Sequence, residues 1–468
     1  MDFKIAQEEK RVRIKMKPSV LLIFQAPRKR NLYVNTLPPL GILSIASFLQ
    51  RNNILLDVFD FTIQNRLDKD LKNYDVVGLS LNMANISTSL ETIRYIKKQN
   101  PDAKVIIGGP SCISNPLYFT NNENIDAICT GEGEEAFLDY IVQGAFIDGK
   151  EIAGLYTRKN KHFVYGGERQ HKNNLDEYPF PALDKVMIHK YNTPLRKRFP
   201  VSSIMTSRGC PFHCTFCFHS MGHEWRARSC INVVDEMEWQ VKELGVKEIC
   251  IQDDNFSLDI KRAKQIFDLI IKRDIMVKLQ FPNGLRVDFI ELDLLDKMFH
   301  AGVWLIGVAP ETGSPELMKK IKKCMDLEKV AQVVQWCRKI GINTYANFMI
   351  GFPAETMQDL RKTASFIKKL NPDFIQITRV ISIPGTPLYE TVTKDDFRNM
   401  FGQEQGTFFG VPKLIKSEML SRDAVRWIKK MHTDFYLNPL KIFRLMTILS
   451  PAQLIRLFIY SLRTGNIW

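Results

Sequence analysis

The chain has 468 residues, of which 45% are hydrophobic and 25% are charged. These globular proportions exclude a wholly disordered, a collagen-like or a many-span membrane protein, and the length predicts two or three domains. Lysine and arginine outnumber aspartate and glutamate by 65 to 51, which gives a formal net charge of +14. This charge suits an anionic partner such as nucleic acid, anionic lipid or a phosphorylated substrate, but its sign does not choose among them.

Residues 1–17 are a basic leader without an apolar core, so we expect neither a signal peptide nor an N-terminal anchor. No stretch approaches the roughly 18 apolar residues that a membrane span needs. The nine cysteines are too few and too unevenly spaced for a disulfide framework, which favours a reducing compartment. These features predict a cytoplasmic protein.

Residues 18–150 alternate apolar strands with amphipathic helices. Strands are expected at residues 20–24, 55–61, 75–81 and 104–110, with helices at 40–53 and 86–99, and residues 125–142 pass from a strand through a glycine turn into a helix. Such alternation indicates a parallel sheet covered on both faces, which binds ligands at the carboxyl ends of its strands. The sequence therefore predicts a Rossmann-like N-terminal domain.

Residues 151–200 are rich in turn formers and are expected to be a linker with one hairpin at most. A second series of strands and helices fills residues 201–400. Its strands are expected at residues 202–207, 248–253, 277–282, 303–309, 343–351 and 373–380. Six such units predict a partial (βα)6 TIM-like barrel, with its chemistry on loops at the carboxyl ends of the strands.

Residues 401–468 are predicted to be a helical C-terminal region. From residue 411 onward this region has ten lysines or arginines against three acids, and no acid follows Asp434. Its apolar faces have two interpretations: they cap the barrel, or they lie in the interface of an anionic membrane. In the second interpretation the basic side chains reach the lipid headgroups; these are Lys441, Arg444, Arg456 and Arg463. The aromatic side chains then reach the acyl boundary; these are Phe443, Phe458 and Trp468.

The segment TSRGCPFHCTFCFHS carries three cysteines, Cys210, Cys214 and Cys217, in the spacing C-x3-C-x2-C directly after a predicted strand. Three thiolates on one tight loop can hold three corners of a [4Fe-4S] cluster and leave the fourth iron open to a small molecule. The alternative is a structural zinc site completed by one histidine, either His213, His219 or His223.

This segment, including the aromatic Phe216 before the third cysteine, resembles the radical S-adenosylmethionine superfamily. The resemblance extends over residues 201–390, through QDDNF (252–256), NGLR (283–286), GVAPETGSPELM (307–318), FMIGFPAET (348–356) and IPGTPLYE (383–390). It implies that S-adenosyl-L-methionine chelates the open iron and is cleaved to a 5'-deoxyadenosyl radical, which takes a hydrogen from the substrate.

The resemblance also implies contacts to S-adenosylmethionine. Asp253 and Asp254 would face its amino group, Glu311 would contact the ribose, and the backbone at Ile350 and Gly351 would meet the adenine. Phe216 belongs to the same expected set of residues that bind S-adenosylmethionine. Each position has an ordinary structural alternative: the aspartates also suit an N-cap and a solvated turn, and the glycine suits a tight turn. No catalytic residue is assigned beyond the cluster cysteines.

The order of the two domains resembles the cobalamin-binding branch of this superfamily. The matching segments are LPPLGILSIASFL (37–49), VVGLSL (76–81), VIIGGP (105–110) and TGEGEEAF (130–137). The resemblance implies a cobalamin site: Ser80 would approach the dimethylbenzimidazole tail, the glycines would let the nucleotide loop pass close to the backbone, and the full set is Ser80, Gly108, Gly109, Pro110, Gly131 and Gly133. The D-x-H-x-x-G motif is missing, because the loop at residues 25–41 has no histidine, so the lower face of cobalt would be open or held by another group.

The preferred function is a cobalamin-dependent methyl transfer to an unactivated carbon or a phosphinate, with a second S-adenosylmethionine remethylating cobalt. One alternative uses the same cofactors for a non-methylating cyclisation, rearrangement or oxidation, and another is a zinc-stabilised ligand-binding or sensor protein. Expected partners are a small-molecule or lipid-like substrate and a one-electron reductant of the flavodoxin or ferredoxin type, with peripheral contact at the inner face of the membrane through the tail. No nucleic acid is expected, since the other cysteines form no second cluster motif and no C-terminal RNA-binding barrel is recognisable.

Overall fold

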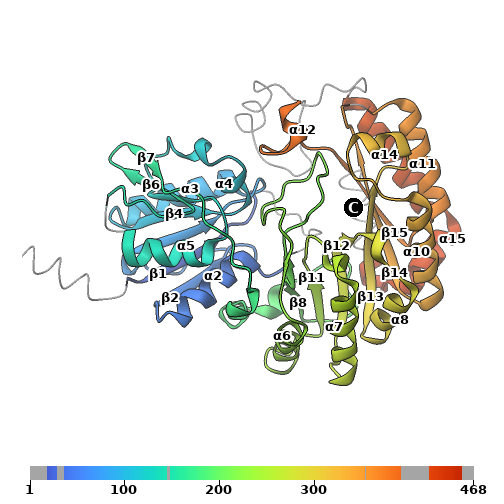
Figure 1. The fold of residues 1–468 in the computed structure, drawn as a ribbon, viewed down its shortest axis with the longest axis horizontal. Coiled ribbons are helices and arrows are strands. Elements are labelled where there is room, and N and C mark those ends of the chain that lie inside the picture. The colour runs from blue at the N-terminus through green and yellow to red at the C-terminus, as the bar shows by residue number, and fades with distance from the viewer. Residues whose placement is uncertain (1–17, 29–35, 145–147, 354, 392–420, 456–468) are drawn as a thin grey trace, which may run out of the picture.

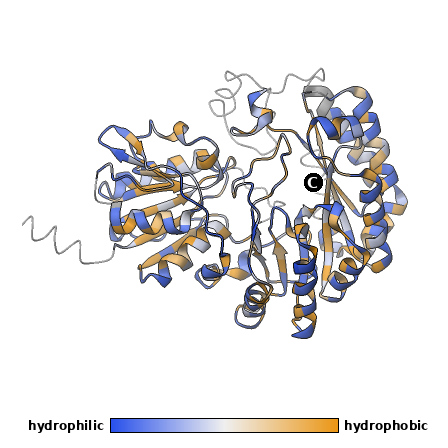
Figure 2. Ribbon diagram, in the orientation of Figure 1, coloured by the Kyte–Doolittle hydropathy of each residue, from blue (hydrophilic) through white to orange (hydrophobic). Residues whose placement is uncertain are grey.

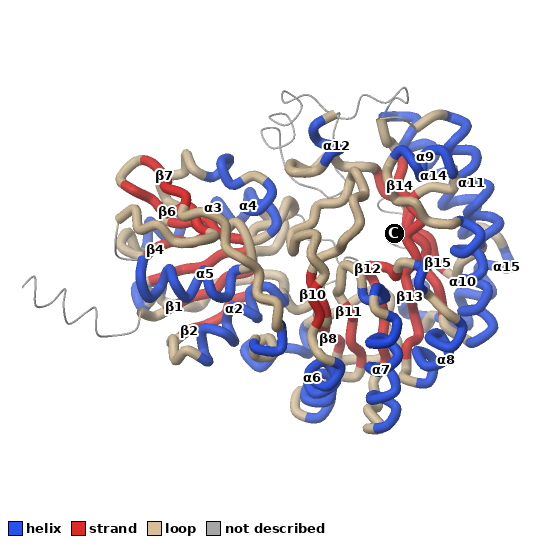
Figure 3. Tube along the Cα trace, in the orientation of Figure 1, coloured by secondary structure: helices blue, strands red, loops and turns tan. Residues whose placement is uncertain are grey.

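The protein folds into two α/β lobes followed by a helical C-terminal segment (Figure 1). The structure is a computed structural model and describes residues 18–28, 36–144, 148–353, 355–391 and 421–455. Figure 3 shows strands at the centre of each lobe, helices around them, and long loops where the lobes face each other. Figure 2 shows that hydrophobic residues concentrate on these strands.

The first lobe contains a seven-stranded sheet in the order β2-β1-β3-β4-β5-β6-β7. Its parallel strands are β1 (Val20–Phe24), β2 (Leu56–Asp60), β3 (Val76–Ser80), β4 (Lys104–Gly108) and β5 (Ala127–Cys129). In β1, Val20 and Leu22 enter one hydrophobic cluster while Leu21 and Ile23 enter another. Both faces of the sheet are therefore buried, as continuous apolar strands predict.

Helices cover the two faces of this sheet. They are α2 (Leu40–Arg51), α3 (Ile86–Gln99), α4 (Pro110–Ser114) and α5 (Gly133–Asp139). Helices α2 and α5 pack on one face and α3 on the other, because their apolar residues enter the two separate clusters. The predicted Rossmann-like lobe is confirmed.

A hairpin within the expected linker extends the first sheet. Strands β6 (Leu155–Lys159) and β7 (His162–Tyr165) pair antiparallel with each other, and β6 pairs antiparallel with β5. This hairpin covers the edge of β5 that would otherwise expose unpaired backbone groups.

The second lobe contains a six-stranded parallel sheet in the order β15-β14-β13-β12-β11-β8. These strands are β8 (Val201–Ile204), β11 (Glu248–Ile251), β12 (Lys278–Leu285), β13 (Val303–Glu311), β14 (Asn343–Ile350) and β15 (Phe374–Arg379). The helices of this lobe are α6 (Cys230–Lys242), α7 (Ile260–Lys272), α8 (Leu292–His300), α9 (Pro315–Lys320), α10 (Leu327–Ile340), α11 (Met357–Leu370) and α12 (Pro387–Glu390). All six predicted strands are present in the predicted order, which confirms the partial barrel.

The C-terminal helices α14 (Ser421–Tyr436) and α15 (Pro439–Ile448) cap this barrel. The hydroxyl of Tyr436 accepts a hydrogen bond from the Ile375 backbone N–H at 2.9 Å and donates one to the Ile375 carbonyl at 3.0 Å, which covers the edge strand β15. Helix α15 lies at the amino ends of the strands, since Arg444 Nε pairs with Asp373 at 2.9 Å just before β15. Helix α15 therefore lies at the end of the barrel opposite to the carboxyl ends of its strands, whereas α14 packs along β15.

This placement differs from the membrane interpretation of the tail. Lys441 is buried and donates to the Pro372 carbonyl, and Arg444 pairs with Asp373, so both point into the protein instead of toward headgroups. Leu440, Phe443 and Met446 are exposed on the outer side of α15. The other residues named for membrane contact, Arg456, Phe458, Arg463 and Trp468, lie outside the described residues. Among the described residues no helix has the length and hydropathy that a membrane span needs.

Candidate active site

The three motif cysteines lie on one loop that begins after the short strand β9 (Ser207–Arg208) and ends at β10 (Arg226–Ala227). We call residues 209–225 the cluster loop. Gly209 turns the chain with a φ of 83°, and a side chain there would place its Cβ 2.2 Å from the Glu224 carbonyl oxygen. The loop is pinned by backbone hydrogen bonds from Cys210 N to Gly222 O at 3.2 Å and from Thr215 N to Ile321 O at 3.0 Å.

Cys210, Cys214 and Cys217 line one cavity of about 410 Å³ at the carboxyl ends of the barrel strands. Desolvation by the walls raises the pKa of all three thiols, that of Cys217 to about 12, while the positive charge of Lys323 acts in the opposite direction. The thiols are therefore protonated until a metal replaces their protons. Among the residues that the structure describes, no three His, Cys, Asp or Glu side chains are grouped as ligands of a single metal ion.

Glu311 and Lys323 form another wall of this cavity, which we call the cluster cavity, in a region of strained backbone. Glu311, Lys322 and Cys324 have φ values of 65°, 53° and 50°, in the left-handed region that non-glycine residues seldom adopt. Glu311 is buried, and Lys323 Nζ lies 3.3 Å from its Oε1. Burial raises the pKa of Glu311, and Lys323 opposes this effect. The wall thus holds one carboxyl group and one ammonium group next to the cysteines.

The two predicted aspartates have different surroundings. Asp253 is buried, and its carboxylate accepts hydrogen bonds of 2.6 Å from the backbone N–H and hydroxyl of Thr206 and from the hydroxyl of Ser207. It therefore holds the strand end that leads into the cluster loop. Asp254 lines the cluster cavity. Its pKa is raised mainly by burial and, to a smaller extent, by the negative charge of the neighbouring Asp253. Asn255 also lines this cavity and is 3% exposed, and neither atom of its side-chain amide has a hydrogen-bond partner among the described residues.

The end of β14 carries Ile350 and Gly351, the two residues predicted to contact adenine. Ile350 is buried, and Gly351 follows it with a φ of 101° and open space where a Cβ would lie. The carboxylate of Glu355 accepts a hydrogen bond from the Gly351 backbone N–H and fixes this turn. Phe216 of the cysteine motif contacts Phe352, with ring centroids 5.5 Å apart. The turn and the cluster loop are therefore adjacent.

These residues fit a [4Fe-4S] cluster with S-adenosylmethionine. Three thiols on one loop suit the corners of a cubane, whose thiolates bind different irons and so lie farther apart than ligands sharing one zinc ion. The unpartnered amide of Asn255 and the carboxyl of Asp254 offer hydrogen bonds to a polar ligand in the same cavity. The motif did not indicate Asn255, Lys323 or Glu355, because their contacts arise only in the fold.

A second cavity of about 330 Å³, the cobalamin cavity, lies at the carboxyl ends of β3, β4 and β5. All six residues predicted for cobalamin line it, namely Ser80, Gly108, Gly109, Pro110, Gly131 and Gly133. Gly109 has a φ of 94°, and a Cβ there would lie 2.8 Å from Leu81 O and Ser80 Oγ. Gly131 also lines the cavity, and a Cβ added to it would have no other atom within 4 Å. This glycine-lined, largely apolar cradle fits a large ligand that packs against backbone.

The barrel contributes to the same cavity, which the sequence did not indicate. Met205, Arg208 and Met221 line it together with the residues of the first lobe. No histidine is among its described lining residues. One stretch of the cluster loop contributes to both cavities: Phe218 and His219 line the cluster cavity, and the next two residues, Ser220 and Met221, line the cobalamin cavity.

Comparison with known proteins finds a family model for each of the two lobes. The Radical SAM superfamily model matches residues 204–367, and the B12 binding domain model matches residues 32–141. The chain is 30% identical over 414 residues to the "Uncharacterized methyltransferase PH0819" of Pyrococcus horikoshii, covering 86% of this chain and 88% of that protein. It is 26% identical to the cytidylyl-2-hydroxyethylphosphonate methyltransferase of Streptomyces wedmorensis, covering 75% of this chain and 67% of that protein.

A solved structure shares the fold. It is the cobalamin-dependent S-adenosylmethionine radical enzyme OxsB with aqua-cobalamin and S-adenosylmethionine bound, with a TM-score of 0.73 at 18% identity over 97% of this chain and 72% of that chain. The fold and the two cavities define a radical S-adenosylmethionine enzyme with an N-terminal B12-binding domain. The chain belongs to the family of cobalamin-binding-domain radical S-adenosylmethionine enzymes.

Proposed function

We propose that this enzyme transfers a methyl group to an unactivated carbon or a phosphinate of a small-molecule substrate, with a [4Fe-4S] cluster, S-adenosyl-L-methionine and cobalamin as its cofactors. The observation that carries this proposal is that consecutive residues of the cluster loop line the two cavities, Phe218 and His219 the first, Ser220 and Met221 the second. In this proposal the substrate lies beside this stretch, next to both cavities. The two relatives named methyltransferases support the same outcome.

The residues of the chain have distinct tasks in this proposal. Cys210, Cys214 and Cys217 hold the cluster, and Asp254 with Asn255 binds polar groups of S-adenosylmethionine. When bound, these cofactors supply a carbon radical that removes a substrate hydrogen, and methylcobalamin supplies the methyl group.

Glu311 and Lys323 place opposite charges beside the cysteines, so the cavity receives an anionic cluster and a zwitterionic ligand without a large net charge of its own. Gly109 and Gly131 let the backbone of the first lobe approach cobalamin closely. A one-electron reductant of the flavodoxin or ferredoxin type completes the set of partners. No histidine of the described cavity is available to bind cobalt.

The test begins with anaerobic reconstitution. The wild-type protein should hold about four irons per chain and release 5'-deoxyadenosine from S-adenosylmethionine under reduction, and Cys214→Ala should abolish both. Cys230→Ala is the matched control, because Cys230 lies on α6 outside the motif. Incubation with S-adenosylmethionine deuterated in its methyl group should then give a substrate product that carries the label. Bound zinc without iron would refute the cluster, and an unlabelled product would show a non-methylating reaction.

A further inference from the structure

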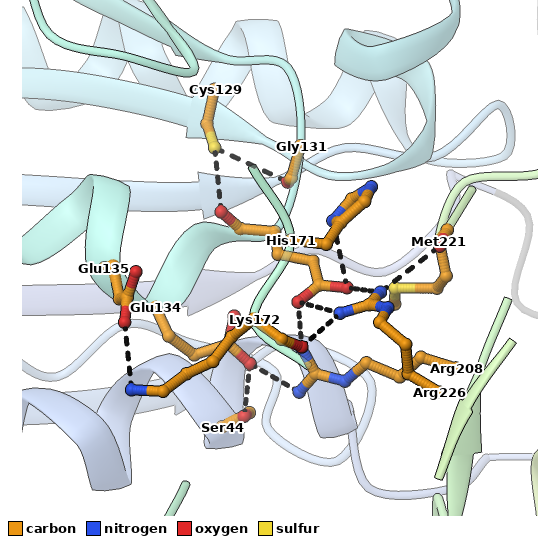
Figure 4. A network of polar contacts seen from close by, with 11 residues as sticks. Ser44, Cys129, Gly131, Glu134, Glu135, His171, Lys172, Arg208, Met221 and Arg226 are labelled. Carbon is orange, nitrogen blue, oxygen red and sulfur yellow. Dashed lines mark hydrogen bonds and ion pairs between the residues drawn. The ribbon is translucent and has the colours of Figure 1, made fainter. Parts of the chain in front are cut away.

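Buried ion pairs connect the loop of the cobalamin cavity to the ends of the cluster loop (Figure 4). Glu132 directly precedes α5 and Glu134 lies in its first turn, and both line the cobalamin cavity together with Gly131 and Gly133. Arg208 ends β9, two residues before Cys210. β9 and β10 pair antiparallel, with Arg208 opposite Arg226, so the two arginines lie at the two ends of the cluster loop.

The geometry of these pairs is specific. Arg208 Nη1 lies 2.7 Å from Glu132 Oε2, and its Nη2 lies 2.7 Å from Glu134 Oε1. Arg226 pairs with Glu132 Oε1, and its Nη1 donates to the Lys172 carbonyl at 2.9 Å. One carboxylate, that of Glu132, therefore joins both ends of the cluster loop to the turn of the cobalamin cavity.

These charges are removed from water. The side chains of Arg226 and Glu132 are 3% and 8% exposed. Burial would raise the pKa of Glu132, but the His171 hydrogen bond and the two arginines outweigh it and hold the pKa well below its ordinary range. A buried charge that loses its partner is strongly unfavourable, whereas a paired one is tolerated. The ionised network is thus satisfied only while the two loops stay together.

We propose that Glu132, Arg208 and Arg226 are positioning residues that couple the two cofactor cavities, so that filling one raises the affinity of the other. The inference rests on the proposed function for the identity of the cofactors. Each ligand restricts the motion of the loop that it touches, and the ion pairs restrict the facing loop as well. The second ligand therefore loses less conformational entropy when it binds. Because coupling between binding sites is reciprocal, cobalamin should tighten S-adenosylmethionine binding by the same factor as the reverse.

The experiment measures the Kd of S-adenosylmethionine on cluster-reconstituted protein with and without hydroxocobalamin. In the wild type, cobalamin should lower this Kd about fivefold or more. Glu132→Gln should reduce the effect to under about twofold while keeping the shape of the side chain. The control Lys97→Met removes a partner of Asp126 within the same lobe, away from both loops, and should retain the wild-type coupling. Equal Kd values in the wild type, or full coupling in Glu132→Gln, would overturn the inference.

Hydrogen exchange on the wild type tests the inference without any variant. Adding S-adenosylmethionine should slow exchange at residues 130–135, and adding cobalamin should slow it at residues 210–217, the cysteine segment, none of which lines the cobalamin cavity. Unchanged exchange at the distant loop in both cases would overturn the coupling. If Glu132→Gln does not fold, Arg226→Lys keeps the charge but removes the forked contact, and it should give intermediate coupling. A wild type that binds no cobalamin at all would refute the proposed function, and the inference with it.

Discussion

Glu248 offers a sharp test of how buried hydrogen bonds hold the linker to the barrel. This carboxylate is 0% exposed at the start of β11. Its Oε2 accepts from the backbone N–H groups of Lys197 and Arg198, each at 2.7 Å, and its Oε1 accepts from Gln280 Nε2 at 2.7 Å and Trp304 Nε1 at 2.9 Å. All four partners are N–H donors, so both oxygens must be acceptors.

Glu248→Gln should therefore destabilise the protein although it preserves size and shape. Either orientation of the new amide directs its NH2 group at two donors. A flip of Gln280 does not restore the network, since its amide nitrogen also donates to Leu195 O at 3.1 Å and Trp304 Nε1 would still face an N–H group. Each buried donor without an acceptor costs about 1–3 kcal/mol, or about 2–6 kcal/mol for two.

Part of this loss is recovered, because burial raises the pKa of Glu248 and the variant no longer buries a charge. We expect a net loss of about 2–4 kcal/mol, which lowers the Tm of a domain of this size by roughly 4–16 °C. The assay is thermal unfolding of the cluster-free protein followed by tryptophan fluorescence. The control is Glu243→Gln, an exposed position on the preceding turn, which should change the Tm by less than about 2 °C. A Glu248→Gln protein within 2 °C of the wild type, roughly 1 kcal/mol or less, would refute the reasoning.

Three other substitutions give distinct outcomes. Asp253→Asn should retain iron after reconstitution, because hydroxyl partners can donate or accept, whereas Asp253→Ala leaves the buried Thr206 N–H without an acceptor and should lower both iron content and Tm. Gly109→Ala should weaken cobalamin binding roughly tenfold or more, measured by equilibrium dialysis, since the added Cβ would lie 2.8 Å from Leu81 O at a φ of 94°. Burial raises the pKa of Glu355 to about 7. The stability from this carboxyl is thus present below about pH 4.5 and lost as pH rises through 7, so the Tm of Glu355→Gln relative to wild type should increase from pH 5 to pH 8 by the equivalent of about 3 kcal/mol.

The fold was predictable because its information is local. Continuous apolar strands such as 20–24 and 104–110 indicate a sheet buried on both faces, and the alternation with amphipathic helices fixes parallel order. The three cysteines of the cluster loop were equally accessible, since one tight loop brings them together whatever surrounds it. Glycines such as Gly109 were predicted from a motif, and the structure supplies the physical reason in a positive φ and a close approach.

Contacts between the lobes were not predictable, since no local pattern reports a partner far along the chain. Glu132 and Arg226 are 94 residues apart in sequence and form one buried pair. Asp253 and Asp254 illustrate the same limit at short range. The sequence gives two equivalent carboxylates, but the fold turns one toward Thr206 and Ser207 and leaves the other on the cavity wall.

The tail shows why amphipathicity alone does not choose a partner. The same pattern of apolar and basic residues suits a membrane surface and a barrel cap, because both bury one face of a helix. The basic residues decide between them here. At the amino end of β15, Lys441 donates a hydrogen bond to the Pro372 carbonyl and Arg444 pairs with the Asp373 carboxylate. These contacts become visible only in the fold, which places residues 372 and 373 beside α15. Since the cluster cavity lies at the carboxyl ends of the same strands, helix α15, with its exposed Phe443, contacts the barrel at the end opposite to that cavity.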